Sequence, residues 1–260
     1  MITTHQFVLR DSTDVEGIAQ ALLRAYRNLQ PASITVAEDL LWDANINRSP
    51  SSYLLNPLEE RDKYAEEGDT DKRFLQLAFT GSNGSQLGLL NWFAVHGTSM
   101  NSSNTLISGD NKGYASYLAE KQYNDRNIMP GMGPFVAAFA STNLGDVSPN
   151  TAGARCIDTG NPCDFETSTC NGKTQMCIAS GPGKDMVEST EIIGRKQFEM
   201  ASKLLNDQQK QSVVRGNIDF RHSFVDLSNV TVTLENETIV RTCPAALGYG
   251  FAGGTTDGPG

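Results

Sequence analysis

A serine and an aspartate stand two residues apart at the point where an apolar run of the chain gives way to a polar segment. Residues 134–140 read PFVAAFA, and the segment 143–150 reads NLGDVSPN, which contains Asp146 and Ser148. Pro149 disfavours the α region for the residue before it, so the hydroxyl of Ser148 points in a reproducible direction. That geometry suits a nucleophile, but an Asx or Ser turn before a proline is the commoner origin of such a pattern. The G-x-S-x-G elbow typical of many hydrolases is not present in the sequence.

A second apolar run also ends in a reactive side chain. Residues 87–95 read LGLLNWFAV and are followed directly by His96. A helix that begins near Asp110 would connect this run to residues 134–140, which predicts a strand, helix, strand unit. Crossovers of this kind are right-handed and make the two strands parallel, and open α/β sheets bind ligands at the carboxyl ends of their strands. We therefore expect His96 and Ser148 on one rim of the sheet.

The remaining periodicity predicts an α/β fold with a mixed sheet and flanking helices around this βαβ unit. Apolar residues at helical spacing predict an amphipathic helix over 14–29, and turn residues between 73–80 and 87–95 predict a hairpin. Residues 218–224 alternate between apolar and polar side chains, which predicts a half-buried strand with His222 on its apolar face as a core residue. Further helices are expected over 59–67 and 188–205, and further strands over 34–40 and 230–234.

The composition limits the classes of partner. The chain has 260 residues, a formal net charge of −9 and a pI near 4.8. It is long enough for one large or two small domains. It has no basic stripe that could replace phosphate counterions, which argues against nucleic acid as a partner. The apolar runs are shorter than the roughly 20 residues of a membrane-spanning helix, and the first residues do not read as a signal peptide.

Glycosylation sequons and clustered cysteines nevertheless indicate the secretory pathway. The sequons begin at Asn47, Asn83, Asn101, Asn229 and Asn236. The simplest interpretation of sequons without a signal peptide is that the chain is an internal piece of a longer secreted or cell-surface protein.

Four of the five cysteines are spaced by sevens, at Cys156, Cys163, Cys170 and Cys177. The Gly, Pro, Asp and Asn residues between them are incompatible with a heptad helix, and no C-x2-C pair is present that would favour a structural zinc site. Two disulfides are the better prediction, and four cysteines allow three pairings. Cys243 is then left over.

Seven segments closely resemble the neutral (non-lysosomal) ceramidases, in the order that the family has them and over nearly the whole chain. They are 47–50 (NRSP), 91–100 (NWFAVHGTSM), 107–113 (ISGDNKG), 143–150 (NLGDVSPN), the four-cysteine segment 156–177, 192–195 (IIGR) and 254–260 (GTTDGPG).

This resemblance implies that the intact parent protein cleaves the N-acyl amide bond of ceramide, releasing sphingosine and a fatty acid. His96 matches a zinc ligand of the family, Ser148 matches its nucleophile, and Arg48 matches an arginine beside the polar head of the substrate. A zinc-bound water could attack in place of Ser148, and the sequence leaves that choice open. Asp146 would orient the site rather than act as its base. The resemblance favours two disulfide pairs, Cys156 with Cys170 and Cys163 with Cys177, and it implies that Cys243 pairs with a cysteine beyond this chain.

The chain departs from the family at the metal site. A catalytic zinc takes three protein ligands, and the further ligand motifs of the family, upstream and downstream, do not occur in this sequence. His5 does not match the upstream motif. We therefore expect residues 1–260 to be a partial catalytic domain, without the N-terminal metal motif and the C-terminal part of the family. One Zn²⁺ would take its remaining ligands from outside the chain, so the 260 residues alone would bind zinc weakly and turn over little or no ceramide.

Two other functions remain open at the level of sequence. One is a non-catalytic member of the same family that binds lipid or a partner protein. The other is a secreted, disulfide-stapled adhesion domain, in which His96 and Ser148 would be structural. Approach to a membrane would depend on parts outside this chain, and the oligomeric state is not predicted.

Overall fold

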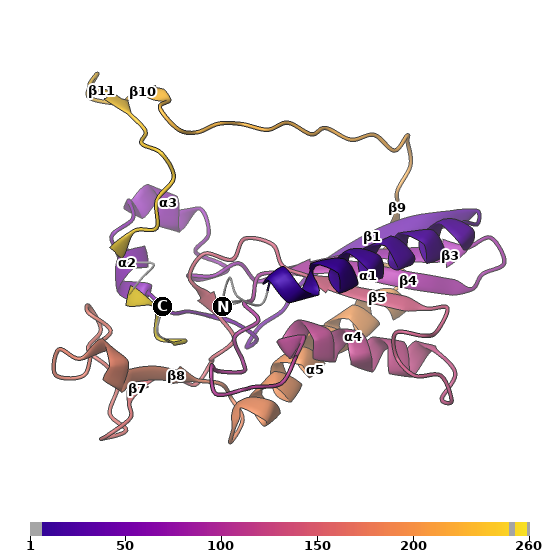
Figure 1. Cartoon of the computed structure of the whole chain (residues 1–260), viewed down its shortest axis with the longest axis horizontal. Helices are drawn as coiled ribbons and strands as arrows, with labels where there is room; N and C mark the ends of the chain where they lie inside the picture. The colour runs from indigo at the N-terminus through magenta and orange to yellow at the C-terminus, as the bar shows by residue number, and fades with distance from the viewer. Residues whose placement is uncertain (1–6, 250–252, 259–260) are drawn as a thin grey trace.

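The computed structural model describes residues 7–249 and 253–258, and its centre is a five-stranded mixed sheet (Figure 1). The strand order is β5-β4-β3-β1-β9. The strands are β1 (Ala32–Leu40), β3 (Arg73–Gly81), β4 (Gln86–Phe93), β5 (Val136–Ala140) and β9 (Ser212–Val213). β4 pairs with β3 in the antiparallel sense and with β5 in the parallel sense. The predictions of an α/β fold with a mixed sheet, and of the β3–β4 hairpin, are confirmed.

Two helices, α4 (Asp110–Tyr123) and α5 (Met186–Asn206), pack against each other and against the sheet. Between them and the sheet lies the main core, whose fully buried members include Phe74, Phe93, Phe135, Ile193 and Leu204. Gly194 of α5 permits the close approach of the two helices, since a Cβ there would lie 2.7 Å from the carbonyl oxygen of Asn111. This core fixes α4 relative to the ends of β4 and β5.

The order β4, α4, β5 forms the predicted βαβ unit. The register pairs Gly88 with Val136 and Trp92 with Ala140, so the two strands end at the same edge of the sheet. Gly88 is required for this pairing, because a Cβ at this position would lie 2.3 Å from the carbonyl oxygen of Val136. Each strand therefore delivers the segment that follows it to one rim.

The structure also contains short ribbons and short helices outside the main sheet. The two-stranded ribbons are β2 (Ile46–Asn47) with β6 (Val147–Ser148), β7 (Gly153–Cys156) with β8 (Cys177–Ser180), and β10 (Thr231–Thr233) with β11 (Ile239–Arg241). The short helices are α2 (Pro50–Leu54), α3 (Leu58–Asp62) and the 3₁₀ helix η1 (Thr174–Met176). Figure 1 places α2, α3 and the β7–β8 ribbon at the end of the molecule opposite the β3–β4 turn.

The helix α1 (Phe7–Arg27) begins earlier than residue 14, where the sequence predicted its start. Its apolar positions are exposed in this structure: Ile18 keeps 64% and Leu22 keeps 67% of its surface. Apolar periodicity therefore predicted the helix correctly, but it did not predict whether the apolar face would find a partner. None of the described helices is both long and apolar enough to cross a bilayer.

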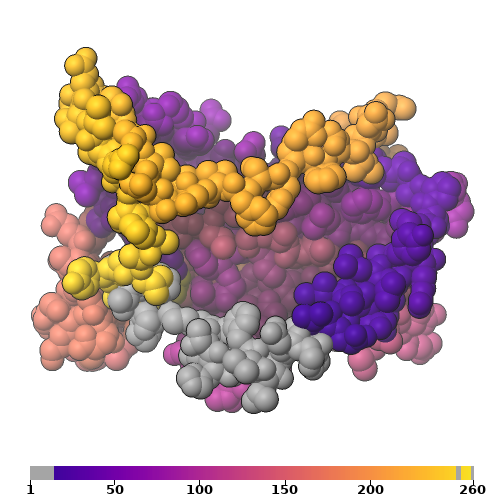
Figure 2. Space-filling model, turned by 45° about the horizontal axis from the view of Figure 1, so that its top comes forward, coloured from indigo at the N-terminus to yellow at the C-terminus, as the bar shows by residue number. Residues whose placement is uncertain are grey.

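The prediction of a half-buried strand over 218–224 was wrong. After β9 the chain leaves the sheet as an extended arm that returns only near α2, which Figures 1 and 2 show in orange and yellow. Ile218 is 95% exposed and Phe224 is 94% exposed, and His222 is exposed as well, not a core residue. Alternation suits a strand only where a neighbouring strand supplies hydrogen bonds, and within the described residues this segment pairs with none.

Candidate active site

The two-stranded β2–β6 ribbon brings together the segments that carry Arg48 and Ser148. Ile46 pairs with Ser148 and Asn47 pairs with Val147. The ribbon continues with a hydrogen bond of 2.9 Å from the backbone N–H of Arg48 to the carbonyl oxygen of Asp146. Residues about 100 positions apart in the sequence are thus fixed side by side by backbone pairing.

Ser148 is fully buried, and its hydroxyl has two partners. The Oγ atom donates a hydrogen bond to Oδ1 of Asp257 at 2.6 Å. It accepts a hydrogen bond from the backbone N–H of Asn150 at 3.0 Å. The side-chain amide of Asn150 also donates to Oδ1 of Asp257, at 2.8 Å. The Ser148 hydroxyl, on the residue before Pro149, thus has one defined direction. It points to the carboxylate of Asp257, which the sequence analysis did not nominate.

Arg48 joins two carboxylates. Its NH1 group donates to Oδ2 of Asp257 at 2.9 Å, and its Nε donates to Oδ1 of Asp146 at 3.3 Å. The Asp257 side chain is 4% exposed, whereas that of Asp146 is 49% exposed. Among the described residues Asp146 makes no hydrogen bond to Ser148, so any orienting influence of Asp146 on the serine passes through Arg48.

His96 lies beside the same ribbon. Its Nδ1 atom is 2.5 Å from the carbonyl oxygen of Val147. A carbonyl only accepts hydrogen bonds, so Nδ1 carries a hydrogen, and in the neutral imidazole Nε2 is then the nitrogen with the lone pair. The backbone of His96 is held as well, because the side-chain amide of Asn111 donates to its carbonyl oxygen at 2.9 Å. The structure thus brings His96 and Ser148 to one rim, as the βαβ unit predicted.

Lys112 ties the ends of β4 and β5 together. Its Nζ donates to the carbonyl oxygens of Phe93 and Ala140, both at 2.9 Å. Burial lowers the pKa of Lys112 from 10.5 to about 7, because the charged ammonium loses its hydration there. The lysine therefore fixes the two points from which the chain departs toward His96 and toward Ser148.

The start of α4 fixes the loop that follows His96. The carboxylate of Asp110 accepts the backbone N–H groups of Ser99 at 3.2 Å and Met100 at 2.9 Å. Asn111 accepts a hydrogen bond from the Nε2 group of Gln197 on α5, at 3.0 Å. Polar contacts from both helices thus hold the residues around the imidazole in place.

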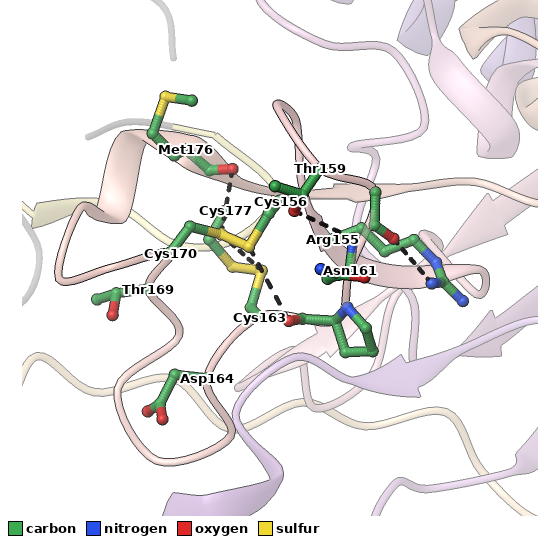
Figure 3. The surroundings of a disulfide bond; sticks show 12 residues. Arg155, Cys156, Thr159, Asn161, Cys163, Asp164, Thr169, Cys170, Met176 and Cys177 are labelled. Atoms are coloured by element: carbon green, nitrogen blue, oxygen red, sulfur yellow. Dashed lines mark hydrogen bonds between the residues drawn. A yellow bond between two sulfur atoms is a disulfide. The ribbon is translucent and has the colours of Figure 1, made fainter.

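Two disulfides staple the loop that follows Ser148 (Figure 3). Cys156 is bonded to Cys170 and Cys163 to Cys177, the pairing that the family resemblance favours. Cys156 and Cys177 also face each other in the β7–β8 ribbon, so the two disulfides stack. Cys243 is exposed and free. Disulfides of this kind are typical of proteins from oxidising compartments.

The described residues fit one position of a zinc site but do not complete the site. Three donor groups come close together only at Cys156, Cys163 and Cys170, in the part of the chain that the structure describes. These sulfurs are bonded in disulfides and are not thiolates, so they are poor zinc ligands. His96, with Nδ1 on a backbone carbonyl and Nε2 free, has the arrangement usual for a ligating histidine. His5 lies outside the described residues.

A cavity of about 250 Å³ opens beside Arg48, between the disulfide-stapled loop and residues 253–256. Apart from Arg48, its lining comes from Ser49, Ser168, Thr174, Gln175, Cys177 and Ile178 and from residues 253–256. The cavity is thus next to the guanidinium, and both polar and apolar groups line it. It offers room for polar groups of a ligand near Arg48.

Three residues that sequence reasoning did not nominate contribute to this site: Asp257, Asn150 and Lys112. Each lies in a segment that carried the family resemblance, so the segments were recognised and the roles were not. Asn150 could have been found from its place two residues after Ser148. Asp257 stands in the glycine-rich segment 254–260, which the sequence analysis used only for the family resemblance.

Comparison with known proteins gives one family. A family model described as "Neutral/alkaline non-lysosomal ceramidase, N-terminal" matches residues 1–260. "Neutral ceramidase A" of Dictyostelium discoideum is 49% identical over 253 residues, which cover 95% of this chain and 35% of the relative. "Neutral ceramidase" of Drosophila melanogaster is also 49% identical over 253 residues, covering 94% of this chain and 36% of the relative. The chain spans about a third of the length of these relatives.

Solved structures agree with the sequence comparison. One described as "Ceramidase complexed with C2" superposes with a TM-score of 0.73 at 34% identity, covering 95% of this chain and 33% of its own. The neutral ceramidase from Pseudomonas aeruginosa superposes with a TM-score of 0.68 at 32% identity, covering 90% of this chain and 32% of its own.

Proposed function

The chain belongs to the neutral/alkaline non-lysosomal ceramidase family, and from that membership we propose that the intact protein hydrolyses the N-acyl amide bond of ceramide. The products are sphingosine and a free fatty acid, and residues 1–260 are part of the catalytic domain. The observation that carries this proposal is the rim formed by His96 and Ser148, which the carbonyl oxygen of Val147 links directly. Arg48 directly follows β2 of the same ribbon and lines a cavity of mixed polar and apolar character.

Ser148 is the proposed nucleophile. Its Oγ attacks the amide carbonyl carbon and loses the hydroxyl proton, the C–N bond breaks, and that proton ends on the leaving nitrogen to give the free amine. Water then hydrolyses the acyl-serine ester to the fatty acid and regenerates the hydroxyl. In the alternative route water attacks the carbonyl directly and Ser148 positions the substrate. Arg48 would contact the polar head of ceramide in either route.

Zinc dependence is part of the proposal. His96 would supply one ligand through Nε2, and the remaining ligands would come from parts of the protein outside this chain. We propose secretion or a cell-surface location, which the two disulfides and the sequons support. Approach to the membrane that holds ceramide would rest on those other parts too.

The test is hydrolysis of a short-chain fluorescent ceramide by the intact protein. We expect Ser148→Ala and His96→Ala each to lower the rate at least about 100-fold, the range in which loss of one catalytic group falls. His222→Ala is the matched control, because His222 is exposed on the extended arm. Unchanged rates in both site variants would remove His96 and Ser148 from the site and contradict their assignment, whereas no hydrolysis by the wild-type protein would contradict the proposed activity.

A second candidate is a lipid-binding protein without turnover. The observation that favours it is the complete burial of Ser148 in this structure. This candidate predicts that the intact protein binds ceramide, in solution or on vesicles, but produces no fatty acid from it at any zinc concentration. That result would support lipid binding against hydrolysis.

A further inference from the structure

We propose that Asp257 is the positioning residue for Ser148, an inference that rests on the proposed role of Ser148 as nucleophile. The two side chains are 109 residues apart in the sequence, and their hydrogen bond of 2.6 Å has the length expected for a charge-assisted bond from a hydroxyl to a carboxylate. The role of Asp257 is to fix the direction of the serine hydroxyl and to raise the electron density on Oγ.

The surroundings of Oγ account for this role. The hydroxyl hydrogen points to Oδ1 of Asp257, and one lone pair accepts the backbone N–H of Asn150. A hydroxyl has two lone pairs, so one remains for attack on a carbonyl carbon. Without the carboxylate the hydroxyl could rotate and offer its hydrogen to the substrate instead.

Asp257 is itself held by more than one donor. Oδ2 accepts from NH1 of Arg48 at 2.9 Å and faces Oγ1 of Thr98 at 3.5 Å, while Oδ1 accepts from the side-chain amide of Asn150 at 2.8 Å. The guanidinium compensates the charge of the carboxylate in a place where only 4% of its side chain is exposed. A carboxylate fixed on both oxygens is preorganised, which is what an orienting group requires.

The loop that carries Asp257 is anchored apart from these contacts. Thr255 and Gly258 exchange two backbone hydrogen bonds, at 2.9 and 3.0 Å, which close a tight turn around Asp257. The carbonyl oxygen of Thr256 accepts the N–H of Ala179 in β8 at 2.8 Å. Backbone hydrogen bonds thus attach the loop to the β7–β8 ribbon without the carboxylate. We therefore expect the loop to stay in place when the side chain of Asp257 is changed.

The experiment measures the reactivity of Ser148 directly, in the intact protein, with a small fluorophosphonate that phosphonylates activated serines. Modification is followed by mass spectrometry at the peptide that contains Ser148, with Ser148→Ala as the blank. The variants are Asp257→Asn, which keeps the shape, and Asp257→Glu, which keeps the charge and shifts it by one methylene. Asp39→Asn is the matched control, since Asp39 pairs with Lys203 and Lys210, away from this site.

We expect Asp257→Asn and Asp257→Glu each to slow phosphonylation on the order of 100-fold, and Asp39→Asn to leave it unchanged. For ceramide, kcat should fall in parallel while KM stays within about twofold, since an orienting group acts on the chemical step. Thermal melts of all variants separate this effect from unfolding. If Asp257 only stabilised the fold through its ion pair with Arg48, Asp257→Glu would keep that pair and would behave like the wild type.

The outcomes separate this inference from the proposed function. Phosphonylation of Ser148 that depends on Asp257, in a protein that does not hydrolyse ceramide, supports the inference and contradicts the ceramidase activity. Ceramide hydrolysis with unchanged phosphonylation and kcat in both Asp257 variants overturns the inference alone. A wild-type protein whose Ser148 is not modified, or variants that lose reactivity only in proportion to lost folded protein, also overturn it.

Discussion

The Nδ1 atom of His96 lies 2.5 Å from the carbonyl oxygen of Val147, the residue that precedes Ser148. This one contact fixes the orientation of the imidazole and leaves Nε2 as its free nitrogen. It also joins the loop after β4 to the short strand β6 that follows β5 in the chain. The positions of the proposed metal ligand and the proposed nucleophile are therefore coupled through a single backbone group.

The first prediction concerns zinc. His96→Ala should lower the zinc affinity of the 260-residue chain by at least about tenfold. Loss of a group that only orients a ligand already lowers metal affinity by about that factor, and loss of the ligand itself should lower it at least as much. Elemental analysis after dialysis against a weak chelator measures this, and we expect well under one zinc per wild-type chain. His222→Ala is the control and should match the wild type. A full zinc retained by His96→Ala would contradict the assignment of His96.

The second prediction concerns the Arg48–Asp257 pair. Arg48→Ala should destabilise the fold by about 3 kcal/mol, because it leaves a buried carboxylate without its cation. Urea denaturation measures the free energy of unfolding. Arg221→Ala is the control: Arg221 also pairs with an aspartate, but its side chain is 85% exposed, so we expect little change. Equal effects of the two substitutions would mean that the burial of Asp257 has no energetic consequence.

The third prediction concerns the disulfides. Replacing Cys163 and Cys177 together by Ser should cost about 3 kcal/mol, the value expected for a closed loop of about 15 residues. Limited proteolysis should then cut within 157–176 first, because the small cluster under this loop consists mainly of cysteines. Persistent resistance of this loop to proteases would show that its backbone contacts suffice.

A thiol count checks the same arrangement without mutation. The unreduced protein should react with one equivalent of a thiol reagent, at Cys243, and the reduced and denatured protein with five, the number of cysteines in the chain. Three reactive thiols before reduction would mean that one of the two disulfides does not form.

The fourth prediction concerns glycosylation of the secreted protein. Asn83, Asn101, Asn229 and Asn236 are exposed and should accept glycans. Asn47 should not, because it is paired in the β2–β6 ribbon and its amide donates to the carbonyl oxygen of Asp69 at 3.1 Å. Enzymatic deglycosylation in heavy-oxygen water followed by peptide mapping locates the modified residues. Asn83→Gln should remove one glycan and Asn47→Gln none, and a glycan found on Asn47 would contradict its pairing.

The fifth prediction concerns pH and Lys112. The unfolded lysine binds its proton up to about pH 10.5 and the folded one only up to about 7. Between these values the unfolded state binds more protons, so this lysine makes the free energy of unfolding rise with pH, by at most about 1.4 kcal/mol per unit. Lys112→Met should lack that contribution.

Urea denaturation at pH 6.5, 8 and 9.5 provides the measurement. The stability of the wild type relative to Lys112→Met should increase across the series. Lys63→Met, which changes an exposed lysine paired with Glu60, serves as the control. A constant difference between wild type and Lys112→Met at all three pH values would contradict burial of a titrating lysine at the strand ends.

Local pattern was enough for much of the fold. The β3–β4 hairpin, α4, α5 and the parallel β4–β5 pair all follow from periodicity, turn residues and the handedness of the crossover, so the common rim of His96 and Ser148 was predictable. The same signals failed for 218–224, because alternation describes a strand's two faces and not whether a partner strand exists. They also said nothing about the burial of α1.

The sequence by itself thus determined which strand ends carry the imidazole and the hydroxyl, since each side chain follows directly from its own apolar run. The disulfide pairing came from family resemblance, because spacing alone left three pairings open. Only the tertiary structure decided what the Ser148 hydroxyl faces. The contact with Asp257 joins two loops 109 residues apart, and a contact of that kind depends on one side chain at each end, which leaves no periodic trace along the chain.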